Sequence, residues 1–202
     1  MPINIPNALT LMRILLIPVL VIVFYLPFQG HWLVAAGIFT LAAVTDWFDG
    51  YLARRLGQMT AFGAFLDPVA DKLMVTVALV LLVERHDTIL FTLAATVIIG
   101  REIVVSALRE WMAELGQRTS VAVSYVGKVK TALQMIAVIG LLAVNPARDA
   151  GWMLGLCYVL LYSAAVLTLW SMTAYLRAAS RVIRAREEEA QNAVTPRDQG
   201  LE

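Results

Sequence analysis

Six mostly apolar stretches, each about 20 residues or longer, recur along the chain and constrain its fold more than any other feature. A helix needs about 20 apolar residues to cross the hydrocarbon core of a bilayer. Such stretches form helices because backbone polar groups inside a membrane must be paired within the structure. The sequence therefore predicts an all-α integral membrane protein with six transmembrane helices, near residues 8–27, 32–54, 60–84, 88–112, 122–144 and 151–178.

The composition supports a membrane protein. Hydrophobic residues make up 60% of the 202 residues, charged residues make up 15%, and the mean hydropathy is +0.75. In typical globular domains about 45–50% of the residues are apolar and about 25% are charged. The formal net charge of +1 gives no reason to expect a nucleic-acid partner. The single cysteine, Cys157, excludes an internal disulfide and a cysteine-based zinc site.

Basic residues predict how the chain is oriented. Cytoplasmic segments of membrane proteins carry an excess of Lys and Arg. Only Arg85 and Arg148 lie in the turns on one side, so the other side is predicted to be cytoplasmic, together with both termini. We expect one six-helix transmembrane domain over residues 1–178 and a charged cytoplasmic tail over 179–202. The cytoplasmic side carries Arg54, Arg55, Arg109, Arg118, Lys128, Arg177, Arg181, Arg184 and Arg186.

Four aspartates lie among apolar residues in the second and third predicted helices. Asp46 and Asp49 are three residues apart, and Asp67 and Asp71 are four residues apart, so each pair shares one face of its helix. The turn between the two helices is short, which makes them antiparallel neighbours. We expect the four carboxylates to meet in a cleft open to the cytoplasm.

Four carboxylates in one cleft cannot all stay ionised without cations, because like charges raise one another's pKa. Oxygen ligands suit Mg²⁺ or Mn²⁺, and paired ions of this kind serve phosphoryl chemistry. Two other interpretations stay open. The aspartates are structural counter-ions to Arg54, Lys72 and Arg101, or they mark the pathway of a divalent-cation or proton-coupled transporter.

The stretch DWFDGYLAR at 46–54, followed after eight residues by GAFLDPVAD at 63–71, resembles the signature of the CDP-alcohol phosphatidyltransferase family. All eight fixed positions of the pattern D-x2-D-G-x2-A-R-x8-G-x3-D-x3-D are filled. The resemblance implies a six-helix membrane enzyme, usually a homodimer. Such an enzyme moves a phosphatidyl group from a CDP-linked lipid to an alcohol and releases CMP.

The resemblance also implies roles for the aspartates. Two divalent ions, Mg²⁺ or Mn²⁺, are expected. Asp46 and Asp67 would bridge both ions, Asp49 would bind one and Asp71 the other, and Asp71 would also be the general base. The donor's CDP group is expected beside Gly50, Ala53, Arg54, Thr60 and Gly63.

The amino-terminal stretch NIPNALTLMR resembles the family's entry into its first helix. Asn7, Thr10 and Arg13 recur every three residues and therefore share one helix face. We expect them to line the nucleotide site. The alternative is structural: Asn7 caps the helix and Arg13 extends to the membrane interface.

A second cluster of residues, in the fourth and fifth predicted helices, is basic. Arg101 and Arg109 are eight residues apart on one helix, and Lys128, Lys130 and Thr131 begin the next. Such a cluster beside an acidic site predicts an anionic acceptor, because phosphates need cationic partners. For Arg109 and Lys130, anchoring by the positive-inside rule is the alternative.

Two acceptors in the family are anionic, glycerol 3-phosphate and inositol phosphate. The stretches AAVTDWFDGYLARR, REIVVSALREWMAELG and VGKVKT are most similar to bacterial family members that use glycerol 3-phosphate. The resemblance therefore implies CDP-diacylglycerol and glycerol 3-phosphate as substrates, within the lipid of a bacterial inner membrane.

Overall fold

The structure is a computed structural model that describes residues 5–56, 61–114, 125–145 and 151–194, and within these ranges every regular element is a helix. Predicted and observed helix bounds agree within three residues, except at the end of the last helix. The helices are α1 (Ile5–Tyr25), α2 (His31–Leu56), α3 (Ala61–His86), α4 (Ile89–Glu114), α5 (Tyr125–Ala143) and α6 (Trp152–Val194).

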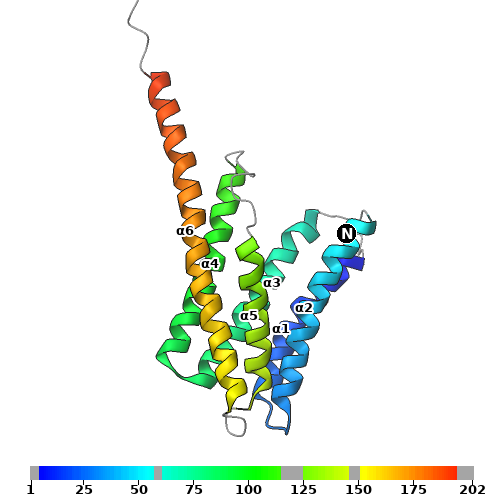
Figure 1. Ribbon diagram of the computed structural model, residues 1–202. Helices are drawn as coiled ribbons and strands as arrows, with labels where there is room; N and C mark the ends of the chain where they lie inside the picture. The colour runs from blue at the N-terminus through cyan, green and yellow to red at the C-terminus, as the bar shows by residue number, and fades with distance from the viewer. Residues whose placement is uncertain (1–4, 57–60, 115–124, 146–150, 195–202) are drawn as a thin grey trace, which may run out of the picture.

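The helices lie side by side in one bundle, beyond which the carboxyl-terminal part of α6 projects (Figure 1). α1 packs against α2 and α3, whereas α6 packs against α4 and α5. One apolar core joins all six helices, as expected for elements that are apolar on most faces. Its fully buried side chains include Leu20, Phe39, Leu82, Leu141 and Leu161.

Three of the described helices are long and apolar enough to cross a membrane, over Asn7–Tyr25, Ile89–Glu114 and Trp152–Arg184. The apolar parts of α2 and α5 are shorter, His31–Asp46 and Val129–Ala143. The aspartates of α2 and α3 and the lysines of α5 shorten the apolar part of each helix near one end. The prediction of an all-α, multi-pass membrane protein is confirmed.

α6 is longer than predicted. It continues without interruption for 43 residues, about 65 Å at 1.5 Å per residue. After residue 178 the sequence is rich in Ala, Arg and Glu, which favour helix, and the first proline is at position 196. The tail therefore begins as a continuation of the last transmembrane helix.

α5 and α6 approach each other closely at Gly140. A Cβ atom added there would lie 2.4 Å from the Cys157 Sγ on α6, a distance at which one side must move. Cys157 is buried. The absence of a side chain at position 140 thus allows the two helices to pack around the thiol.

In Gly140→Ala, overpacking is expected to cost about 1–3 kcal/mol of the free energy of unfolding. The higher helix propensity of alanine offsets about 1 kcal/mol of that cost. Thermal unfolding in detergent measures the change. In a Cys157→Ala background most of the loss is expected to disappear, and additive effects of the two substitutions would contradict the proposed contact.

Candidate active site

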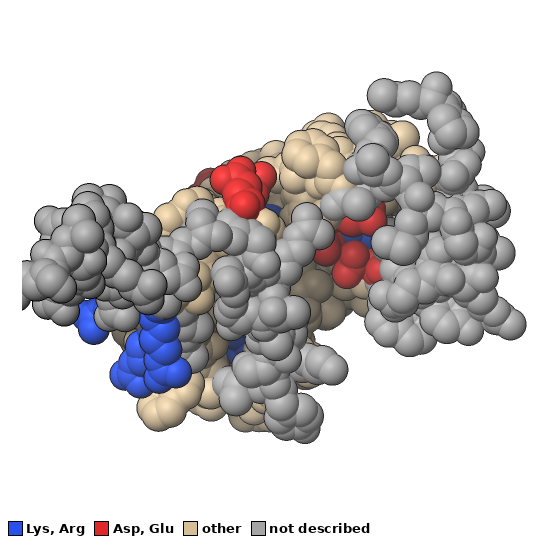
Figure 2. All heavy atoms as spheres, turned by 90° about the horizontal axis from the view of Figure 1, so that it is seen from above, with Lys and Arg blue, Asp and Glu red and all other residues tan. Residues whose placement is uncertain are grey.

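The carboxylates of α2 and α3 lie against the polar face of α1. The Arg13 Nη1 is 2.9 Å from the Asp46 Oδ1 and also donates to the Asp71 Oδ1. The Thr10 hydroxyl donates to the Asp67 Oδ1 at 2.5 Å. Three helices therefore contribute to one polar cluster, and Figure 2 shows acidic side chains around a basic one in a hollow of this face.

Asn7, Thr10 and Arg13 are all buried, with Arg13 only 1% exposed. The predicted common face on α1 is confirmed. The guanidinium of Arg13 contacts carboxylates inside the bundle, so the alternative in which it extends to the interface is wrong. A buried arginine is tolerated because carboxylates compensate its charge.

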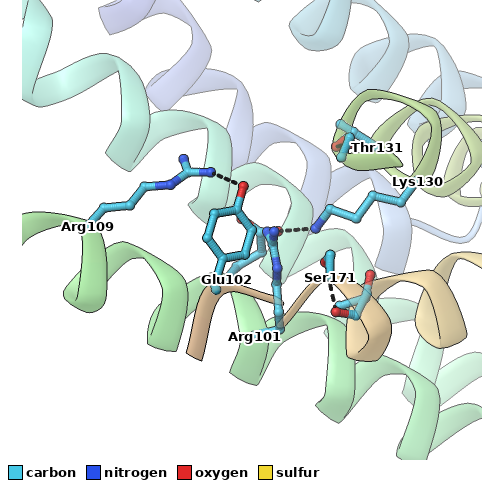
Figure 3. A network of polar contacts seen from close by, with 9 residues as sticks. Arg101, Glu102, Arg109, Lys130, Thr131 and Ser171 are labelled. Carbon is cyan, nitrogen blue, oxygen red and sulfur yellow. Dashed lines mark hydrogen bonds and ion pairs between the residues drawn. The ribbon is translucent and has the colours of Figure 1, made fainter. Parts of the chain in front are cut away.

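The basic residues gather on the other side of the site, around a residue that the sequence analysis did not single out. The Glu102 Oε1 accepts hydrogen bonds from the Arg101 Nη1 at 2.6 Å and from the Lys130 Nζ at 3.3 Å. Figure 3 shows Lys130 extending from α5 toward Glu102 on α4. Arg101 is 6% exposed and Lys130 2%, so neither is a surface anchor.

A second unpredicted residue, Tyr175 of α6, contacts both arginines. Its hydroxyl accepts a hydrogen bond from the Arg109 Nη2 at 3.0 Å. The guanidinium carbons of Arg101 and Arg109 lie 5.5 and 5.3 Å from the centre of its ring. These are cation–π distances. The predicted common face of Arg101 and Arg109 is confirmed.

One cavity of about 390 Å³ joins the acidic and basic sides. This volume lies within the range of small-ligand sites. Asp46, Asp67 and Asp71 line one part, and Glu102, Arg109 and Thr131 line another. The Thr131 hydroxyl also donates to the Gly127 carbonyl at 2.9 Å. The cavity can hold a ligand that contacts carboxylates and cations at once.

Several predicted site residues lie outside the described part. Thr60 falls between the described ranges. Five further residues lie on described helices, but their surroundings are outside the description: Asp49, Gly50, Ala53, Arg54 and Lys128. Gly63 is buried on α3. The counter-ion interpretation named Arg54, Lys72 and Arg101, but in the described part Arg13 pairs with the aspartates, and Arg101 pairs with Glu102.

The carboxylate oxygens of this site are chemically suitable ligands for a divalent metal. Asp46 and Asp71 both have an oxygen on the same nitrogen of Arg13, so their carboxylates already converge on one positive charge. Oxygen ligands are those that Mg²⁺ and Mn²⁺ prefer. Among the described side chains no three acidic, histidine or cysteine residues come together as a complete metal site, and Asp49 is not among those side chains.

Glu102 carried a signal in the sequence. An ionisable residue deep in an apolar helix is a functional candidate by default. Glu102 directly follows Arg101, and the prediction of an anionic acceptor was based on the basic residues alone. Tyr175 carried no such signal, because an aromatic residue near the end of a membrane span usually lies at the interface.

The fold and the cavity together define a helical membrane protein with a polar site that has carboxylates on one side and cations on the other. The sequence profile of the CDP-alcohol phosphatidyltransferase family matches residues 3–170, and the chain belongs to that family. The resemblance drawn from the aspartate motif is confirmed.

Individual relatives are similar over most of the chain. A CDP-diacylglycerol–glycerol-3-phosphate 3-phosphatidyltransferase from Salmonella choleraesuis is 58% identical over 179 residues, which cover 89% of this chain and 96% of the relative. A protein of the same name from Pseudomonas fluorescens is 59% identical over 177 residues, 87% of this chain and 90% of the relative. One from Yersinia pestis is 58% identical over 179 residues, 89% of this chain and 96% of the relative.

Proposed function

We propose that this chain transfers the phosphatidyl group of CDP-diacylglycerol to glycerol 3-phosphate, giving phosphatidylglycerophosphate and CMP. The observation that carries the proposal is the cavity that joins Asp46, Asp67 and Asp71 to Arg109 and Thr131. The first group suits a metal-bound pyrophosphate and the second suits an acceptor phosphate. Relatives that are 58–59% identical are named for the same reaction.

The reaction exchanges the phosphoanhydride bond of the donor for a phosphodiester bond. The free hydroxyl of glycerol 3-phosphate attacks the lipid-bearing phosphorus, and the bond from that phosphorus to the CMP oxygen breaks, so CMP leaves with the electron pair. The hydroxyl proton passes to Asp71, the proposed general base. The cations around Glu102 hold the acceptor phosphate, and thereby direct the hydroxyl toward the acidic side.

Two divalent ions, Mg²⁺ or Mn²⁺, are proposed at Asp46, Asp49, Asp67 and Asp71. When bound, they neutralise charge on the donor pyrophosphate and on the departing CMP. The donor's CDP group is proposed to contact the polar face of α1, the end of α2, the start of α3 and the segment between them, at Asn7, Thr10, Arg13, Gly50, Ala53, Arg54, Thr60 and Gly63. The contacts of the buried Thr10 and Arg13 with the aspartates support that assignment.

The acceptor phosphate is proposed to lie among Arg101, Arg109, Lys128, Lys130 and Thr131. We further propose a homodimer in the bacterial inner membrane, with the site and both termini facing the cytoplasm. Residues 1–178 would form the catalytic domain and 179–202 the cytoplasmic tail. Bacterial relatives and the apolar helices support the membrane assignment.

CMP release tests the proposal. Purified protein in detergent is supplied with CDP-diacylglycerol, a divalent metal, and either glycerol 3-phosphate or inositol phosphate. We expect CMP to appear only when donor and glycerol 3-phosphate are both present. Release with inositol phosphate alone would move the assignment to the other acceptor, and cation flux into vesicles without CMP release would support a transporter instead.

A further inference from the structure

Three cations from two helices converge around Glu102 and Tyr175. Arg101 and Arg109 come from α4 and Lys130 comes from α5. Their mutual repulsion is strongest between Arg101 and Lys130, because both of these side chains are buried. Long side chains also lose rotamer freedom when they are held in one place. Such an arrangement needs groups that keep it assembled.

Glu102 is placed to hold two of the three cations. One of its oxygens accepts from both the Arg101 Nη1, at 2.6 Å, and the Lys130 Nζ, at 3.3 Å. The carboxylate thus links α4 to α5 at the cavity, which Glu102 itself lines. Hydrogen bonds between charged groups are the strong ones, and they set direction as well as distance.

The Glu102 contact does not use every hydrogen-bond donor of Arg101. The Arg101 Nε is buried and has no hydrogen-bond partner among the described residues. A buried donor without a protein partner is one that a bound ligand or water would satisfy. Arginine presents its donors in a rigid planar fork, so holding it through Nη1 also fixes the direction of Nε.

The charges match a phosphate monoester. Arg101, Arg109 and Lys130 with the single carboxylate of Glu102 carry a formal charge of +2. A phosphate monoester carries a charge of about −1.5 to −2 near neutral pH. The group as a whole is therefore close to neutral only when such an anion is bound.

We propose that Glu102 is a positioning residue for the acceptor phosphate, supported by Tyr175, whose ring contacts both arginines. Glu102 keeps Arg101 and Lys130 at one point, and the Tyr175 hydroxyl keeps Arg109 beside them. The proposal rests on the function proposed above. It assigns to Glu102 no contact with the reacting atoms.

The test is the kinetics of Glu102→Gln, which keeps the size of the side chain and removes its charge. Two effects on phosphate affinity oppose each other in this variant. The more positive charge of the site favours the anion, whereas the separation of its cations disfavours it. The second effect is expected to be larger, because the phosphate needs several donors at once. We expect KM for glycerol 3-phosphate to rise about tenfold, the effect of losing a charge-assisted hydrogen bond. The donor KM and kcat should change by less than about threefold.

Matched variants separate positioning from general damage. Glu110→Gln makes the same change on an exposed position of α4 and should leave all constants unchanged. Glu102→Asp keeps the charge and should recover part of the lost acceptor affinity. Tyr175→Phe removes only the hydroxyl that holds Arg109, and should raise the acceptor KM by a few-fold. Arg101→Ala, which removes a cation itself, sets the upper limit of the effect.

Each other outcome overturns the inference in a distinct way. A fall in acceptor KM in Glu102→Gln would mean that the carboxylate competes with the phosphate. A rise in donor KM alone would place Glu102 on the donor side. If Glu102→Gln does not fold, an unchanged acceptor KM in Tyr175→Phe overturns the proposal that Glu102 and Tyr175 hold the cations in place. If the wild-type protein releases no CMP, the proposed function is wrong. If the wild-type protein is active and the variants keep its acceptor KM, only the positioning role of Glu102 is wrong.

Discussion

Asp71→Asn is expected to lower kcat by about 10²–10⁴-fold, the usual contribution of a general base. The amide cannot accept the proton of the attacking hydroxyl. It keeps an oxygen that can accept from Arg13, which contacts Asp71 in the structure, so the α1–α3 contact and the fold should persist. Donor KM is expected to change little, because the remaining proposed donor contacts are intact. Steady-state CMP release at varied donor concentration measures both constants.

Asp87→Asn is the control for this substitution. Asp87 lies after the far end of α3 and has a φ of 36°. Asparagine adopts positive φ as readily as aspartate, so the backbone there should not change. The control variant should keep wild-type kinetics. A folded Asp71→Asn protein with near-normal kcat would remove Asp71 from the role of base.

Loss of the metal should abolish activity. We expect EDTA to bring CMP release below detection, and Mg²⁺ or Mn²⁺ to restore it in the wild-type protein. In Asp67→Asn neither ion should restore it, because a proposed ligand to both ions has lost its charge. Asp67 accepts a hydrogen bond from Thr10, which an amide oxygen can also accept, so the variant should fold.

A binding measurement separates the metal from catalysis. A ligand that binds only the folded protein raises its unfolding temperature. Mg²⁺ or Mn²⁺ should therefore stabilise the wild-type protein and Asp87→Asn, and should stabilise Asp67→Asn much less. Equal stabilisation of Asp67→Asn, or turnover near the wild-type rate, would exclude the bridging role of Asp67.

The sequence by itself determined the number and bounds of the helices. Apolar runs and the breaks between them are local properties, and the observed bounds follow them closely from α1 to α5. The aspartate motif and the three-residue spacing of Asn7, Thr10 and Arg13 are local as well. Residues on one helix face stay together wherever that helix is packed.

Only the tertiary structure decided which charges meet. The Arg13 contacts reach Asp46 and Asp71 across two helix interfaces, and Lys130 reaches Glu102 from another helix, 28 residues away. Tyr175 joins the site from α6, 66 residues beyond Arg109. The rotation of each helix about its axis selects such partners. That rotation follows from how the apolar faces of all six helices fill one core, which no single stretch of sequence contains.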